Sequence, residues 1–350
     1  MGKCRPIDNI LAAVRMEEPE RVAVTALEQE HAVSIAGIRY SEFARDPKKL
    51  AETHLLAVRR YSLDWVWIHV DDWIAFEPMG VKVRFFDDKV PTGEGFAVKC
   101  EADIDRLRIP DPHRDGRIPV ILEGIRLIHE MTRGEIMICG ALAAPFSTVT
   151  LLRGLQAGLI DLYRAPQTFR RLMDIGLEVA KVYAEAQIEG GAHALWVGDC
   201  MASSRIISER HFREFALPYI KRLIEEIRRM GGISILFTDE KDPERLLLEV
   251  ESNPEVIAIG TAISIAKAKE VLGDRVCICG NVDPVEVLLK GSREDVERAT
   301  SECIESGAVG GGYFLNTGEC TARDMPPENM RVFVETALKL GKYPLRGAEA

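Results

Sequence analysis

Three residues near the C-terminal end of this 350-residue chain could together bind a metal ion. Asp239, Cys279 and Cys320 each stand at or just past the end of a short apolar run. Thiolates and carboxylates are zinc ligands, and three protein ligands leave the fourth tetrahedral position open to a substrate. The pattern therefore predicts a catalytic zinc site, provided that the fold brings the three side chains together.

Glu240 follows Asp239 directly and could replace it as ligand or orient it from outside the metal's own ligands. Both carboxylates are therefore candidate catalytic residues. The alternative for each cysteine is a place in the core, because free cysteines are among the most buried residues. Cys277 is expected to face the side of its strand opposite to Cys279 and to pack under a helix.

Other polar and aromatic residues near the ends of apolar runs are candidates for substrate binding. Carboxylate and imidazole groups can bind a substrate or transfer a proton, and aromatic rings can flank an apolar ligand. Any one of these residues could instead be a hydrogen-bonded loop residue. The candidates are Glu28, His31, Trp73, Phe146, Asp199 and Asn316.

The elements that must position these residues are eight short apolar segments separated by helical patterns. Apolar runs between helices are typical of buried parallel strands. Eight strand–helix units predict one (β/α)8 TIM barrel of class α/β over residues 1–350, with all strand ends on one rim. A doubly wound sheet is the alternative, but no Gly-rich phosphate loop follows the first strand. The segments are 22–27, 66–70, 136–140, 195–198 and 256–260, with three more inside 233–240, 276–284 and 312–320.

Residues 74–118, after the second predicted strand, interrupt this alternation. Residues 81–86 and 96–100 alternate polar with apolar side chains around a Pro-Thr-Gly-Glu-Gly turn, which predicts a β-hairpin. An insertion at this end of the barrel would lie beside the site and could act as a lid.

Composition limits the partners. The chain is 47% hydrophobic and 29% charged, with a formal net charge of −10, which argues against nucleic acid and anionic membranes. No apolar run could span a membrane, and the first residues lack an apolar signal core. Together with the use of eight cysteines, this predicts a cytoplasmic protein. A flat apolar helix face would allow a homodimer.

Several motifs resemble the uroporphyrinogen decarboxylase superfamily over nearly the whole chain. They are Ile-Ser-x-x-x-Phe-Arg-Glu-Phe-Ala-Leu-Pro-Tyr at 207–219, Cys-Gly-Asn-Val-Asp-Pro at 279–284 and Leu-Asn-Thr-Gly-Glu-Cys at 315–320. That superfamily has a (β/α)8 barrel, so the resemblance implies the same fold as the strand count.

The resemblance does not extend to the decarboxylases' substrate-binding segment. These enzymes carry Met-Arg-Gln-Ala-Gly-Arg after the first strand, whereas residues 25–31 here read Thr-Ala-Leu-Glu-Gln-Glu-His. This segment has no arginine, and its negative charge would repel a polycarboxylate. Glu319 also replaces the histidine of the family's Leu-Asn-x-Gly-His. Uroporphyrinogen decarboxylase activity is therefore not expected.

The cobalamin-dependent methyltransferases are the other branch of the superfamily. Members that methylate thiols hold zinc with a His-x-Cys and a later Cys; Cys320 matches the last ligand, while Phe237 and Asp239 replace the others. An Asp/Cys/Cys set resembles the variant sites of methyltransferase components of O-demethylases. This implies zinc-dependent methyl transfer from a small methoxylated donor, a phenyl methyl ether, to cob(I)alamin. The chain lacks the corrinoid-binding Asp-x-His-x-x-Gly motif, so a separate corrinoid protein would carry the cobalamin.

Two alternatives remain open at this point. Transfer could run from a methylated corrinoid to a thiol, which the charge of two thiolates and one carboxylate on zinc would suit better. The barrel could also bind a tetrapyrrole or corrinoid without chemistry. The first two hypotheses predict zinc and turnover, and the third predicts neither.

Overall fold

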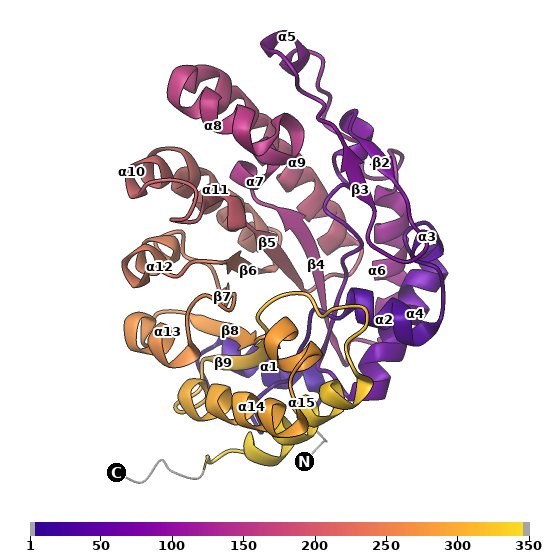
Figure 1. Ribbon diagram of the computed structural model, residues 1–350, viewed down its shortest axis with the longest axis vertical. Coiled ribbons are helices and arrows are strands. Elements are labelled where there is room, and N and C mark those ends of the chain that lie inside the picture. The colour runs from indigo at the N-terminus through magenta and orange to yellow at the C-terminus, as the bar shows by residue number, and fades with distance from the viewer. Residues whose placement is uncertain (1–3, 346–350) are drawn as a thin grey trace.

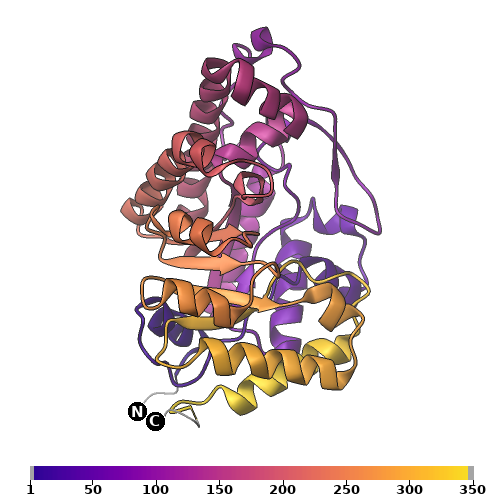
Figure 2. The same ribbon diagram turned by 60° about the vertical axis from the view of Figure 1, so that its left-hand side comes forward.

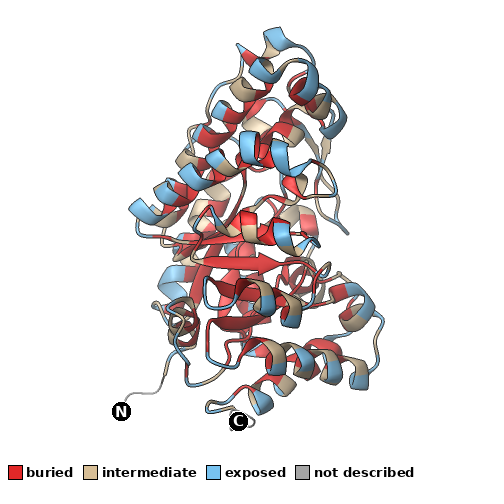
Figure 3. Cartoon of the chain, turned by 90° about the vertical axis from the view of Figure 1, so that its left-hand side faces the viewer, coloured by how far each residue is buried: buried red, intermediate tan, exposed pale blue. Residues whose placement is uncertain are grey.

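Seven of the predicted strands form one parallel sheet at the centre of the protein, and a computed structural model describes residues 4–345 (Figure 1). The strands pair in chain order, and nearly all of their residues are buried, as Figure 3 shows, because helices cover the sheet. They are β1 (Trp65–Trp67), β4 (Met137–Ala143), β5 (Ala194–Gly198), β6 (Ile233–Thr238), β7 (Val256–Ile259), β8 (Cys277–Val282) and β9 (Tyr313–Thr317).

The eighth predicted strand, residues 22–27, is extended but does not form a regular strand. Its backbone bonds with Leu315 of β9 on one side, and Val24 accepts a bond from Asp64, next to β1, on the other. The Asp64 carboxylate accepts from the Val24 N–H at 2.7 Å, and the Leu27 N–H donates to the Thr317 hydroxyl at 3.1 Å. Side chains thus take the place of some of the backbone hydrogen bonds that a regular strand would form. The segment still joins the two edges of the sheet, β1 and β9.

The buried residues divide into an inner core, enclosed by the strands, and an outer core between strands and helices. Helix α1 (Pro6–Val14) belongs to the inner core through Ile7, Ile10 and Ala13. Cys277 and Cys279 both lie in the inner core as well, so the expectation that they face opposite sides is wrong. Residues two apart in a strand share a face.

The remaining helices surround the sheet (Figures 1 and 2). None of the helices between residues 4 and 345 has both the length and the apolar character needed to cross a membrane. They are α2 (Gln29–Ala36), α3 (Tyr40–Phe43), α4 (Pro47–Tyr61), α5 (Glu101–Ile104), α6 (Ile118–Thr132), α7 (Pro145–Arg153), α8 (Leu155–Arg164), α9 (Pro166–Glu189), α10 (Glu209–His211), α11 (Leu217–Arg229), α12 (Pro243–Val250), α13 (Ile265–Leu272), α14 (Arg293–Gly307) and α15 (Pro327–Leu340), with π-helical turns at Phe212–Ala216 and Pro284–Leu289.

A two-stranded antiparallel ribbon follows β1 in the chain. It consists of β2 (Lys82–Arg84) and β3 (Thr92–Glu94). The second strand was predicted at 96–100, which is wrong: β3 lies within the segment expected to form the turn. Arg117 ties this region to the loop after β1, since its guanidinium binds both oxygens of Asp71, at 2.7 and 3.1 Å, and a Glu77 oxygen at 2.7 Å.

Candidate functional site

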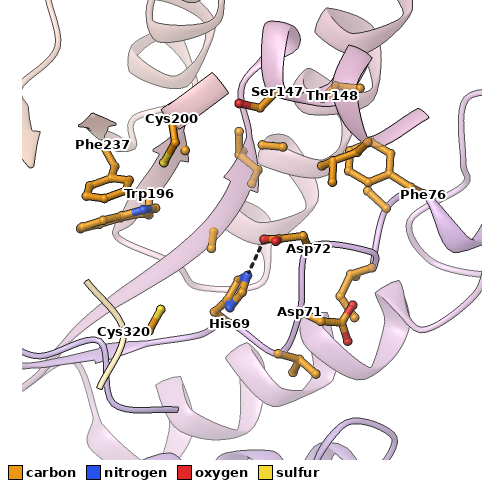
Figure 4. A pocket seen from close by; sticks show the side chains of 18 of the residues that line it. His69, Asp71, Asp72, Phe76, Ser147, Thr148, Trp196, Cys200, Phe237 and Cys320 are labelled. Carbon is orange, nitrogen blue, oxygen red and sulfur yellow. Dashed lines mark ion pairs between the residues drawn. The ribbon is translucent and has the colours of Figure 1, made fainter. Parts of the chain in front are cut away.

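A pocket of about 380 Å³ opens where β1, β4, β5 and β6 end, and residues after β9 complete its wall (Figure 4). The carboxyl ends of parallel strands meet at one edge of a sheet, which is where barrel proteins place their sites. The pocket is therefore the candidate active site.

Aromatic rings form one wall of this pocket. His69 stacks on Trp67 with ring centroids 4.7 Å apart, and Phe237 stacks on Trp196 at 4.9 Å. The two pairs meet edge to face between Trp67 and Trp196, at 5.8 Å. Trp67 and His69 are two residues apart, as a strand requires for side chains on one face. Such a wall suits a flat apolar ligand.

Acidic side chains line part of the pocket's polar surface. Glu30, Asp72 and Glu319 all contribute, and the Asp72 carboxylate lies 3.3 Å from His69 Nε2. Burial, followed by the nearby charge of Asp239, raises the pKa of Glu319 to about 7. No Lys or Arg is among the described residues that line the pocket. The pocket therefore favours a neutral or cationic ligand over a polyanion.

Two thiols also face the pocket, Cys200 and Cys320. Burial raises the pKa of both well above the ordinary value, and the charge of Glu319 raises it further. The Gln29 amide donates a weak hydrogen bond to Cys320 Sγ at 3.6 Å. Without a cation beside them, both thiols are protonated at neutral pH.

The structure does not assemble the predicted zinc ligands. Cys279 is fully buried in the inner core, where the Asn316 amide donates to its Sγ at 3.3 Å. Asp239 instead pairs with Arg205 at 2.9 Å on a loop. Among residues 4–345, no three His, Cys, Asp or Glu side chains are grouped so that they could hold a metal ion. As placed here, the predicted residues do not fit a three-ligand zinc site.

Glu240, the second predicted catalytic carboxylate, organises a loop instead. It is 1% exposed, and its oxygens accept from the Ser204 amide at 2.7 Å and from the Lys241 and Asp242 amides at 2.8 Å. With its oxygens engaged in these bonds, Glu240 does not line the pocket.

Two predicted substrate-binding residues are buried under α4. Glu28 binds His54 Nδ1 at 2.9 Å with neither side chain exposed, and His31 Nε2 lies 2.8 Å from the Tyr61 hydroxyl. Burial lowers the pKa of His31 to about 4, so it stays neutral. Neither residue lines the pocket, so these predictions are not supported by the arrangement.

The two predicted aromatic residues also lie elsewhere. Trp73 packs so closely over Gly93 of the ribbon that a Cβ there would lie 2.8 Å from its ring. Phe146 is fully buried against Phe169, with centroids 5.3 Å apart. Neither ring lines the pocket.

Asp199 does not line the pocket itself but binds a residue that does. Ser147, which lines the pocket, donates its hydroxyl to Asp199 Oδ1 at 3.0 Å. Burial raises the pKa of Asp199 to about 7. Asp199 therefore positions a pocket residue, as Asn316 does for a core residue.

Trp67, Trp196 and His69 are not among the residues that the sequence analysis proposed for substrate binding. Both tryptophans are buried, but they also line the pocket at the open end of the inner core. The signal available was the spacing of Trp67 and His69, which puts two flat polarisable rings on one face at the end of a strand.

Comparison with known proteins establishes the family. The sequence model of the uroporphyrinogen decarboxylase (URO-D) family matches residues 5–340, so the chain belongs to this family. The uroporphyrinogen decarboxylase of Syntrophotalea carbinolica is 29% identical over 309 residues, which is 87% of each chain. That of Geobacter metallireducens is 28% identical over 312 residues, covering 87% of this chain and 88% of the relative.

Solved structures show the same fold. A methyltransferase from Methanosarcina mazei superposes with a TM-score of 0.88 at 22% identity, covering 96% of this chain and 99% of that one. A B12-independent methionine synthase from Shewanella sp. W3-18-1 reaches 0.54 at 11% identity, covering 83% and 86%.

Proposed function

We propose that this protein is a methyltransferase that takes a methyl group from a small aromatic methyl ether and passes it to cob(I)alamin on a separate corrinoid protein. The observation that carries the proposal is the pocket wall, in which stacked aromatic rings stand beside acidic groups without Lys or Arg. The fold shared with a methyltransferase supports this choice within the family.

The same wall argues against decarboxylation of a polycarboxylate. Such a substrate needs cations to bind its carboxylates. Glu30, Asp72 and Glu319 would each repel one in their charged forms. A neutral methoxylated ring has no such cost and can stack on the aromatic wall.

The chemical difficulty is the leaving oxygen. The corrinoid supplies the nucleophile for the methyl carbon, and the electron pair of the broken carbon–oxygen bond stays on the oxygen. Glu319 in its acid form can donate the proton that turns this oxygen into a phenol. The rings around the site keep water away from the reacting atoms.

Zinc remains a prediction from the sequence, and no step above passes through a metal. Elemental analysis of the wild type and of Cys279→Ala and Cys320→Ala tests it. About one zinc per chain, lost in either variant, would require Cys279 to leave its place in the inner core. If zinc is lost only in Cys320→Ala, Cys320 is a ligand and the other ligands are pocket residues rather than Cys279.

The function itself is tested anaerobically with reduced cobalamin and a panel of methoxybenzenes. The expected result is a phenol, detected by chromatography, formed in step with the change in cobalamin absorbance. Demethylation of methylcobalamin by an added thiol, with no phenol from any ether, would instead establish the opposite direction. Tight binding of a corrinoid without turnover in either assay would establish a binding protein.

A further inference from the structure

The pocket is larger than the reacting ring requires. Its volume is about 380 Å³, whereas a cavity of about 150 Å³ is enough for benzene. The aromatic wall, Glu319 and Cys320 occupy only one end. Figure 4 shows Trp196, Phe237 and Cys320 on one side of the His69–Asp72 pair and Phe76 and Thr148 on the other.

The second end reaches into the helix layer, and its lining is mainly apolar. The residues that define this outer arm come from three helices: Ile121 from α6, Leu151 from α7, and Val179, Ala180 and Tyr183 from α9. Ile121, Val179 and Ala180 are 2–4% exposed, so they would otherwise count as core residues. Apolar surface that faces a cavity instead of another side chain is available to an apolar ligand.

Hydroxyl groups interrupt this lining, those of Thr148 and Thr150 from α7 and that of Tyr183 from α9. Tyr183 is 7% exposed and lines the pocket, and no hydrogen bond of its hydroxyl is found among residues 4–345. Burial raises the pKa of Tyr183, so the hydroxyl keeps its proton and can donate. The hydroxyl is not one of the fully buried polar atoms that lack a partner, so it is open to the cavity, where a ligand can accept its proton in a hydrogen bond.

We propose that the outer arm binds an apolar substituent of the methyl donor, an alkyl chain or second ring, and that the Tyr183 hydroxyl donates to an oxygen on it. The donors would then be substituted aryl ethers longer than one ring. This inference rests on the proposed function for the identity of the reacting ring. The arm itself is defined by the cavity and can be tested by binding alone.

The length of the arm is tested with 4-alkylphenols of increasing chain length, using calorimetric titration of the purified chain. Burying each methylene should strengthen binding by about three- to fourfold. Ala180→Leu, which fills the arm, should abolish this gain for the longer chains and leave phenol binding unchanged. Ala157→Leu on α8, away from the pocket, is the matched control. A wild type whose affinity does not depend on chain length, or an unchanged gain in Ala180→Leu, would overturn the proposal.

Tyr183→Phe tests the polar contact, because it keeps the ring and removes only the hydroxyl. Affinity for a phenol with a hydroxyl on its 4-alkyl chain should fall about tenfold, as expected for one lost hydrogen bond, while affinity for the plain alkyl analogue should not. Tyr163→Phe, at an exposed tyrosine, is the control. Equal effects on both ligands would refute the assigned hydrogen bond.

The two proposals fail separately. Chain-length-dependent binding without methyl transfer from any ether would keep the arm and reject the methyltransferase function. Methyl transfer with equal kcat/KM for methoxybenzene and its 4-alkyl derivatives would keep the function and reject the arm.

Discussion

At the scale of single residues, Glu319 combines position and protonation in a way that suits acid catalysis. It lines the pocket beside Cys320, and burial raises its pKa to about 7. A group with this pKa is half protonated at neutral pH and can give up a proton readily. The decarboxylase motif has a histidine at the position that Glu319 occupies here. An ionisable side chain is therefore kept at this position, but its charged form is negative instead of positive.

Glu319→Gln should lower methyl transfer from an ether by about a hundredfold or more at pH 6, since the variant cannot donate this proton. In the wild type, the acid form is lost as the pH rises through about 7, so activity should fall above that value. The variant's profile should be flat. The measurement is the pH dependence of kcat, with Glu294→Gln on the exposed face of α14 as control. Equal pH profiles for variant and wild type would exclude Glu319 as the acid.

Asp199 predicts a pH-dependent stability. Its pKa is raised from 3.8 to about 7 by burial, so folding costs more free energy once the carboxyl is charged. The stabilisation that protonated Asp199 contributes to the folded state is therefore fully present below pH 4, and it is lost as the pH rises through about 7. Asp199→Asn, which can still accept from Ser147, should be more stable than the wild type by about 2–4 kcal/mol at pH 8.5 and by much less at pH 5. Urea unfolding at both values measures this, and a difference independent of pH would contradict it.

Residue types at strand ends predicted some of the site but not all of it. Cys320 lines the pocket, and Asp199 lies one hydrogen bond behind it. Cys279 does not line the pocket because β8 continues to Val282, which places the thiol in mid-strand in the inner core. Glu28 does not line the pocket because its carboxylate binds His54, which lies on α4. Neither the depth of a residue along its strand nor a long-range partner can be read from local spacing.

At the scale of elements, Arg117 decides how the segment after β1 is held. Its guanidinium is almost fully buried and forms two bonds to Asp71, a pocket residue, and one to Glu77. These contacts fix the loop that supplies His69 and Asp72 to the pocket. An ion pair of this kind organises a site more than it stabilises a fold.

Arg117→Ala should destabilise the protein by about 3–5 kcal/mol, because it leaves the Asp71 carboxylate buried without a partner. Phenol binding should weaken at the same time. Urea unfolding and calorimetric titration measure the two effects. Arg126→Ala removes an arginine from an exposed pair on α6 and should change neither quantity. A fully stable Arg117→Ala variant would show that the loop is held by packing alone.

Strand periodicity predicted seven of the elements because each is a buried run between helices. It failed for residues 22–27, where the Asp64 carboxylate and the Thr317 hydroxyl take the place of backbone partners. It also misplaced β3 in the ribbon, where short exposed strands carry almost no apolar signal.

At the scale of the whole molecule, the sheet has its two edges joined by the segment at residues 22–27. Asp64 is central to this junction, since it binds Val24 and also accepts two bonds of 2.7 Å from Arg21. The inner core then has contributions from α1 and from strands throughout the chain. No part of it can separate without exposing the rest.

The chain should therefore unfold in a single cooperative transition, because this shared inner core couples the strands to one another. Differential scanning calorimetry should give a calorimetric enthalpy equal to the van't Hoff enthalpy, and tryptophan fluorescence and far-ultraviolet circular dichroism should change together. Two resolved transitions would show that separate parts of the sheet unfold independently.

The junction between residues 22–27 and β9 also constrains how the protein is made. The Thr25 hydroxyl donates to the Leu315 carbonyl, 290 positions further along the chain. While the ribosome is still synthesising the chain, the buried residues Val22, Val24 and Leu27 have no β9 to contact. These residues lack their partner strand until the chain has been translated through Tyr313–Thr317, so the junction can form only after the sequence between its two sides has been synthesised.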